Sequence, residues 1–103
     1  MKRVSEKMAI GMPDEPLVWC PGCECLHRFN VNRPNEVTGA RWTWNGNIDS
    51  PTFSPSLVFN NVKGEGTRCH SFLRDGVWEF LQDCTHSLAG QKVPLPDLPP
   101  WVR

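Results

Sequence analysis

Long apolar runs and net charge are both missing from this 103-residue chain. No stretch approaches the roughly 20 consecutive apolar residues that a membrane-spanning helix needs, and the first residues hold no apolar segment of signal-peptide length. We therefore expect a soluble protein of the cytoplasm. Eleven Lys and Arg balance eleven Asp and Glu, so the formal net charge is zero with neutral His. This balance argues against a generally basic nucleic-acid-binding protein.

Common catalytic signatures are also absent from the sequence. It contains no G-x-S-x-G, no P-loop and no H-E-x-x-H, and it lacks the H-x-E…P-C-x-x-C order of the zinc deaminases. Neither an internal repeat nor a low-complexity block is present. We therefore assign no catalytic residue from the sequence.

The remaining composition favours short strands and turns. Eight Gly and ten Pro interrupt any long helix. A chain of this length forms one domain, which we divide into a polar N-terminal arm at 1–16, a zinc-stapled β domain at 17–92 and a Pro-rich extended tail at 93–103. The expected fold class is mostly β: a small antiparallel sheet of about five to six short strands, with a zinc-ribbon-like knuckle, a C-terminal hairpin and little helix.

The clearest local signal is a hairpin around Asp75-Gly76. β-rich runs flank this dipeptide, which favours a two-residue turn. That turn pairs Leu73 with Trp78. Because side chains alternate along a strand, Cys69 shares the face of Leu73 and His70 lies on the opposite face. Other elements are expected at 17–20, 27–31, 40–44 and 57–60 (strands), 50–56 (extended, without a ladder) and 83–89 (one helical turn).

Five Cys and three His are the unusual component of the sequence. In a reducing cytosol we favour metal ligands or free thiols over disulfides. The segment Cys20-Pro21-Gly22-Cys23 is a half-site for tetrahedral zinc, in which Gly permits the turn. In the predicted register Cys84 is a diagonal neighbour of Cys69, about 7–8 Å away at Cα, so the two side chains can lean together. The leading ligand set is Cys20, Cys23, Cys69 and Cys84.

The fourth ligand stays open. His86, two residues after Cys84, is the main rival, and His27 and His70 are further candidates, with His70 disfavoured by its face of the hairpin. The alternative for Cys69 and Cys84 is a role as small buried hydrophobic residues. Structural zinc in small domains contributes ~10–16 kcal/mol coupled to folding, which would staple the two hairpins together.

Several motifs follow one another between residues 17 and 97: CPGC with His27 after it, WTWNG, PTFSPS, CHSFLRDG and DCTHSLAGQ. In this order they resemble a family of small phage and prophage proteins of uncharacterised activity, often automatically labelled "ammonia monooxygenase". The resemblance implies a phage or prophage origin and a Cys/His metal site, and Cys25 departs from the family pattern. The label conflicts with the ligand chemistry, because oxygenases use His-rich or His/carboxylate sites whereas thiolates favour closed structural zinc.

The favoured function is a phage or prophage accessory protein that acts as a non-enzymatic protein-binding module, for example by inhibiting a host enzyme or defence system. Aromatic and Arg side chains dominate interface hot spots. The side chains expected to contact a protein partner from host or phage are Trp42, Trp44, Trp101, Arg41 and Arg74. Two alternatives stay open. One is a zinc-ribbon-like nucleic-acid-binding protein. The other is a metal-dependent hydrolase in which His27, His70 and His86, with Asp83 or Glu79, form an open metal site.

Overall fold

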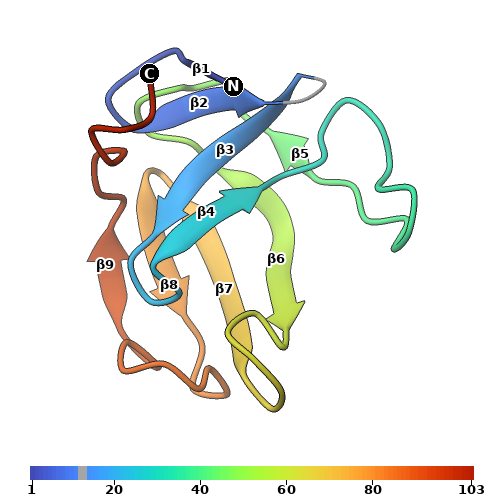
Figure 1. Ribbon diagram of the computed structural model, residues 1–103, viewed down its shortest axis with the longest axis vertical. Helices are drawn as coiled ribbons and strands as arrows, with labels where there is room; N and C mark the ends of the chain where they lie inside the picture. Colours follow the sequence, from blue (N-terminus) through green and yellow to red (C-terminus); the bar gives the residue numbers. More distant parts are fainter. Residues whose placement is uncertain (12–13) are drawn as a thin grey trace.

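The computed structural model describes residues 1–11 and 14–103, which form nine strands and no helix. The strands build two antiparallel sheets (Figure 1). The first sheet contains, in spatial order, β1 (Lys2–Arg3), β2 (Met8–Gly11), β3 (Glu15–Cys20) and β4 (Cys25–Arg28). The second contains β5 (Thr43–Trp44), β6 (Phe53–Asn60), β7 (Arg68–Arg74), β8 (Val77–Phe80) and β9 (Lys92–Pro94). The expected mostly β class is confirmed, with more strands than expected and a second sheet.

Residues 1–16, for which the sequence suggested a polar arm, supply β1, β2 and the start of β3; positions 12 and 13 lie outside the described residues. Met8 is fully buried although the charged residues Glu6 and Lys7 come directly before it in the sequence. Glu15 is also fully buried, and its carboxylate accepts hydrogen bonds from the backbone N–H groups of Val31 and Asn32, which satisfies the carboxylate inside the protein. Long-range pairing therefore orders a segment that looks polar and unstructured when read locally.

The core lies between the two sheets. Phe29, just after β4, stacks on Phe53 of β6 with ring centroids 3.8 Å apart. Trp78 of β8 is fully buried, and its indole N–H donates to the Trp19 carbonyl across 3.0 Å. Aromatic side chains bury much apolar area per residue, and buried Trp needs a partner for its N–H. These contacts join strands that are far apart in the chain into one body.

The β7–β8 hairpin has the predicted register. Leu73 pairs with Trp78, and the turn residues Asp75 and Gly76 have φ angles of 50° and 71°. Two consecutive positive φ angles are typical of a type I′ turn, which matches the twist of the flanking strands. Cys69 and Leu73 are buried on the inner face, whereas His70 lies on the half-buried outer face, as the alternation predicted.

Two local predictions were wrong. Segment 83–89 forms turns instead of a helical turn, because the Thr85 N–H bonds across to the Arg68 carbonyl at 2.9 Å. Residues 53–56 do belong to β6, but the register with β7 shifts between Phe53 and Leu57, around Pro55. A proline lacks the N–H that a ladder needs, so it is tolerated at such an irregularity. The described residues include no helix long and apolar enough to cross a membrane.

Candidate active site and candidate metal centre

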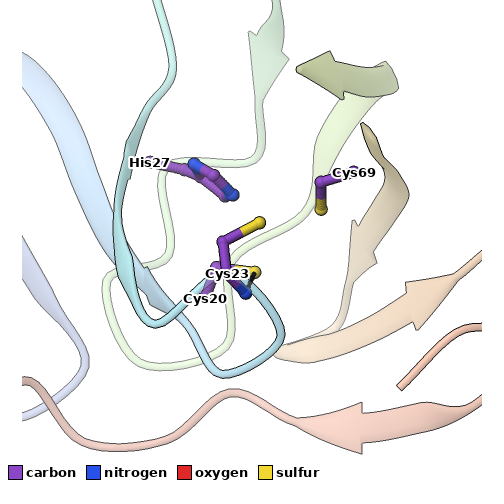
Figure 2. A group of neighbouring side chains, drawn as sticks. All are labelled: Cys20, Cys23, His27 and Cys69. Atoms are coloured by element: carbon purple, nitrogen blue, oxygen red, sulfur yellow. Dashed lines mark hydrogen bonds between the residues drawn. The ribbon is translucent and has the colours of Figure 1, made fainter. Parts of the chain in front are cut away.

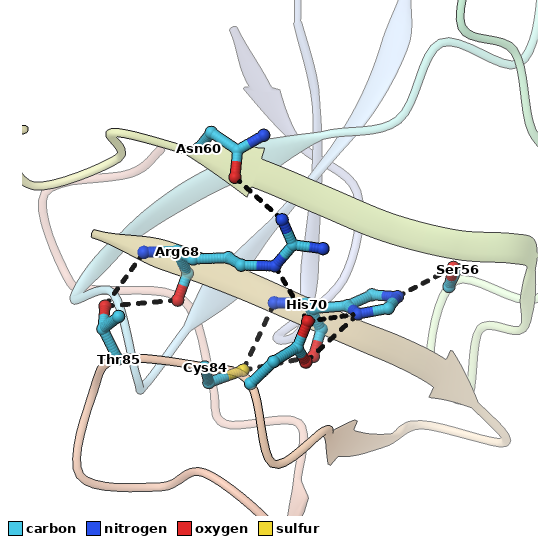
Figure 3. Close-up of polar contacts among 7 residues, drawn as sticks. Ser56, Asn60, Arg68, His70, Cys84 and Thr85 are labelled. Atoms are coloured by element: carbon cyan, nitrogen blue, oxygen red, sulfur yellow. Dashed lines mark hydrogen bonds and ion pairs between the residues drawn. The ribbon is translucent and has the colours of Figure 1, made fainter. Parts of the chain in front are cut away.

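Three polar side chains form a connected row on the outer face of the second sheet. His70 Nδ1 lies 3.0 Å from Asp83 Oδ2, and His70 Nε2 lies 3.3 Å from Ser56 Oγ (Figure 3). One imidazole thus bridges a carboxylate and a hydroxyl, in the order found in Ser-His-Asp triads. The Ser–His contact is slightly long, as is common in triads without substrate. In this arrangement the imidazole can take the hydroxyl proton while the carboxylate holds the opposite ring nitrogen.

Strand register explains how this row assembles. Val58 of β6 pairs with His70 of β7, and Ser56 lies two residues before Val58, so Ser56 and His70 share one face. On the other side of β7, the Leu81 N–H bonds to the His70 carbonyl at 2.9 Å. Asp83 follows two residues later and lies beside the imidazole. Two adjacent strands and the segment after β8 therefore supply one residue each.

Arg68 and Cys84 hold the acidic end of the row in place. The Arg68 guanidinium donates through Nε to Asp83 Oδ2 at 2.8 Å and through Nη1 to the Asn60 side chain at 3.2 Å (Figure 3). Hydrogen bonds from His70 and then from Arg68 hold the pKa of Asp83 below its ordinary value. Cys84 accepts from the His70 N–H and donates to the His70 carbonyl, which ties the Asp83 segment to β7.

A separate Cys/His cluster lies inside the protein. Cys20, Cys23, His27 and Cys69 are all buried, and one ligand atom from each lies within 4.8 Å of the others (Figure 2). Zinc ligated by thiolates and imidazole is tetrahedral, with ligand atoms about 2.0–2.3 Å from the ion, so its ligands lie close to one another in this way. His27 Nε2 is buried and has no hydrogen-bond partner among the described residues. A buried ring nitrogen without a partner is the atom a metal ion would satisfy.

The β3–β4 hairpin shapes this cluster. Cys20 pairs with Cys25 at the hairpin end, and the Glu24 N–H donates to the Cys20 carbonyl at 2.8 Å. The Cys23 N–H points at Cys20 Sγ, 3.3 Å away, and supports the sulfur as expected for a zinc knuckle. At Gly22 an added Cβ would lie 2.3 Å from a ring carbon of His86, so no other residue fits without movement. The Pro-Gly turn therefore brings Cys20 and Cys23 together and also leaves room for the His86 ring to pack against Gly22.

The pKa values of the three clustered thiols shift in opposite directions. Hydrogen bonds from Cys23 and Cys69 lower the pKa of Cys20. Donation to Cys20 raises the pKa of Cys23 to about 12, and the same contact raises the pKa of Cys69. Burial raises the pKa of Cys25, which favours its neutral thiol. A divalent cation would replace the shared protons and stabilise all three thiolates together.

Cys84 and His86, also proposed as ligands, belong to a second group. Their ligand atoms and Cys69 Sγ lie within 4.8 Å of one another. Cys69 is thus common to both groups. In the buried group that contains Cys20 and Cys23, the fourth candidate ligand is His27, whereas the sequence favoured Cys84. Since the Cys84 thiol already bonds the His70 backbone at both 3.2 and 3.1 Å, it has a structural role of its own. The ligand set stays a prediction.

The side chains expected to bind a partner are in different places. Arg41, Trp42 and Trp44 line one pocket together, and Arg74 and Trp101 take no part in its lining. Trp42 is half-buried and donates its indole N–H to the Ser56 carbonyl at 3.3 Å, next to the Ser-His-Asp row. Trp101 is 62% exposed. Arg74 covers the Phe72 ring at 3.9 Å.

The family model described as bacterial ubiquitination-like system serine protease (BubE) matches residues 3–81. The chain belongs to the BubE family. The match includes Ser56, His70 and the whole Cys20, Cys23, His27 and Cys69 cluster, and it ends two residues before Asp83. No curated protein and no solved structure matches the chain. The phage or prophage origin is not tested by these comparisons and stays a prediction.

In this BubE-family chain, the row of Ser56, His70 and Asp83 was not predicted from the sequence. The sequence placed His70 on the outer face and suggested it as a metal ligand, or as part of an open metal site with Asp83 or Glu79, but not as a general base for Ser56. The hairpin register holds a signal that finds part of the row, since continuing the alternation past Leu81 brings Asp83 to the face of His70. Ser56 has no comparable local signal, because its neighbour relation depends on the pairing of β6 with β7.

Proposed function

We propose that this BubE-family protein is a serine protease with Ser56 as the nucleophile, His70 as the general base and Asp83 as the group that orients the imidazole. The observation that carries the proposal is the single imidazole that contacts Asp83 at 3.0 Å and Ser56 at 3.3 Å through its two nitrogens. The family, described as a bacterial ubiquitination-like system serine protease, supports the same activity.

The reaction follows from the roles of the three groups. Ser56 Oγ attacks the substrate carbonyl carbon while its proton moves to His70 Nε2. The imidazolium then gives that proton to the leaving amine, the C–N bond breaks, and an ester to Ser56 remains. Water attacks the ester, His70 takes a proton from the water and returns it to Ser56 Oγ, and the new carboxylic acid leaves. Asp83 stays ionised throughout, which its lowered pKa and its contact with Arg68 favour.

For the Cys/His cluster we propose one structural Zn²⁺ held by Cys20, Cys23, His27 and Cys69. Four protein ligands close the tetrahedral coordination, which is typical of structural sites, whereas catalytic zinc keeps an open position. Cys69 directly precedes His70 on β7, and the other three ligands come from the β3–β4 hairpin and its turn. The ion would therefore fasten the first sheet to the strand that carries the general base.

A fluorophosphonate probe tests the proposed activity without a known substrate. Such a probe phosphonylates an activated serine with loss of fluoride, so we expect one adduct, on Ser56, found by peptide mass spectrometry. Ser56→Ala should remove the adduct, and His70→Ala should slow its formation. Ser54→Ala is the matched control, because Ser54 is an exposed serine on the same strand and should not affect labelling. Unlabelled Ser56 in folded protein, or equal labelling of His70→Ala, would refute the protease.

The alternative proposal, the non-enzymatic protein-binding module of phage or prophage origin, has a specific observation in its favour. Trp101 is 62% exposed and packs edge-on against Trp19 with ring centroids 6.4 Å apart. Exposed Trp is characteristic of interface hot spots. The labelling experiment separates the two functions, because a binding module requires no reactive Ser56.

A further inference from the structure

An open groove of about 830 Å³ runs beside Ser56. Its two long walls come from different sheets: β4 and the residues after it form one, and the second half of β6 forms the other. Figure 1 shows β4 and β6 as neighbouring strands of the two sheets. The lining side chains used in the argument below are Leu26, Arg28, Arg41, Ser56, Val58 and Asn60.

The β6 wall presents free backbone groups to the groove. On β7, the His70 N–H bonds to Cys84 and the His70 carbonyl to Leu81, both on the side away from β6. The facing pair of Val58 and His70 is therefore a non-hydrogen-bonded pair of the antiparallel ladder, in which the N–H and C=O groups of both residues point outward. Since this direction repeats every second residue, Asn60 points the same way as Val58.

Among the described residues, no strand covers this edge. β5 pairs with β6 only at Phe53 and Ser54, so the stretch from Ser56 to Asn60 has β7 as its single neighbouring strand. The Trp42 indole N–H occupies the Ser56 carbonyl at 3.3 Å, and the free part of the edge begins beyond it, at Val58 and Asn60. Unpaired strand edges bind extended peptides by adding them as a further strand. The nucleophile lies just before this free part of the edge.

The β4 wall is a second free edge. β4 is the last strand of its sheet in the described structure. The Phe29 N–H bonds to the Pro16 carbonyl at 3.0 Å, on the β3 side. By the same alternation, the backbone groups of Leu26 and Arg28 point away from β3 and toward the groove.

The groove carries positive charge although the whole chain is neutral. Arg28 is exposed on one wall, and Arg41 is anchored by a hydrogen bond from its Nε to the Val31 carbonyl at 3.1 Å. None of the described residues that line the groove is acidic. Two cations without a local counter-charge favour an acidic ligand and disfavour a basic one.

We propose that the groove binds an extended polypeptide segment with acidic side chains, which pairs with the free edge of β6 and places a peptide bond at Ser56. This assignment rests on the proposed protease function and names its substrate class. Main-chain pairing with Val58 and Asn60 supplies affinity for any extended chain, and Arg28 and Arg41 select the acidic ones.

Internally quenched peptide libraries test the charge preference. We expect libraries with a fixed Glu to be cleaved with a kcat/KM about tenfold above matched libraries with a fixed Lys. The double variant Arg28→Glu/Arg41→Glu should reverse this order, and Arg28→Glu alone should weaken it. Lys92→Glu is the control, because it makes the same charge change on the exposed strand β9, outside the groove.

Backbone pairing is tested with the best acidic peptide. N-methylation at single positions should lower kcat/KM at every second residue, because alternate N–H groups of an added strand point to β6. Fluorophosphonate labelling of Ser56 in each preparation separates the failures. Labelled protein that cleaves no peptide, cleaves both charges equally or tolerates every N-methyl group overturns the groove assignment and leaves the protease intact. Unlabelled Ser56 overturns both.

Discussion

Asp83→Asn examines the proposed triad most directly, because it changes charge and hydrogen bonding at constant size. Both carboxylate oxygens of Asp83 lie near His70 Nδ1, at 3.0 and 3.2 Å. Arg68 Nε also donates to Oδ2 at 2.8 Å. An amide must turn its oxygen to Arg68, since two donors would otherwise face each other. Its NH₂ group then donates to Nδ1, so the ring proton moves to Nε2.

This change of tautomer removes the general base. With the proton on Nε2, the imidazole donates to Ser56 instead of accepting its proton. In the Ser-His-Asp template the same substitution lowers kcat by about 10⁴-fold. The Asp83 side chain is 46% exposed, so water replaces part of the lost stabilisation of the imidazolium. We expect the rate of Ser56 labelling to fall by about 10²- to 10⁴-fold.

The assay is the second-order rate of fluorophosphonate labelling at neutral pH, measured by intact mass. Asp49→Asn is the matched control, because Asp49 is an exposed aspartate in the turn between β5 and β6 and should leave the rate unchanged. Circular dichroism should show the same fold for both variants. A folded Asp83→Asn protein that labels at the rate of the unmodified protein would refute the role given to Asp83.

Three further predictions follow from the same contacts. Native mass spectrometry should find about one zinc per chain, lost in His27→Ala and kept in Cys84→Ser; the opposite pattern would return Cys84 to the ligand set. Folding lowers the pKa of Asp83, so its contribution to stability is complete above the ordinary value of 3.8 and disappears as the pH falls through the lowered value. The melting temperatures of the unmodified protein and of Asp83→Asn should therefore converge at low pH. A difference in melting temperature that persists in acid would contradict this. Gly22→Ala should lower the free energy of unfolding by about 1–3 kcal/mol, because the added methyl group would contact the His86 ring. Urea denaturation measures this change, and an unchanged denaturation midpoint would show that the ring moves aside freely.

Local patterns were sufficient for much of the second sheet. Asp75-Gly76 specifies its own turn, and that turn fixes the pairing of Leu73 with Trp78 without help from the rest of the chain. The Cys20–Cys23 turn was recognisable for the same reason. The first sheet was harder, because Met8 packs in the common core and Glu15 is satisfied by backbone N–H groups 16 and 17 residues later in the chain. A polar segment gives no sign of such partners.

The residues of the candidate site also differ in how far local sequence patterns could predict them. His27 was named as one ligand candidate among several, and the hairpin that brings it back beside Cys20 makes it the fourth member of the buried cluster. Side chains alternate between the two faces of a strand because of backbone geometry, and this alternation was enough to predict that His70 lies on the outer face.

The β class, the hairpin register and the Cys20–Cys23 half of the buried cluster follow from the sequence alone, since each depends on residues within one turn or one short repeat. Tertiary structure decided that Ser56, His70 and Asp83 meet, and that His27 joins Cys20, Cys23 and Cys69. The reason is physical: contacts between separate strands depend on which sheet edges pair and how two sheets pack, and these are properties of the whole folded chain.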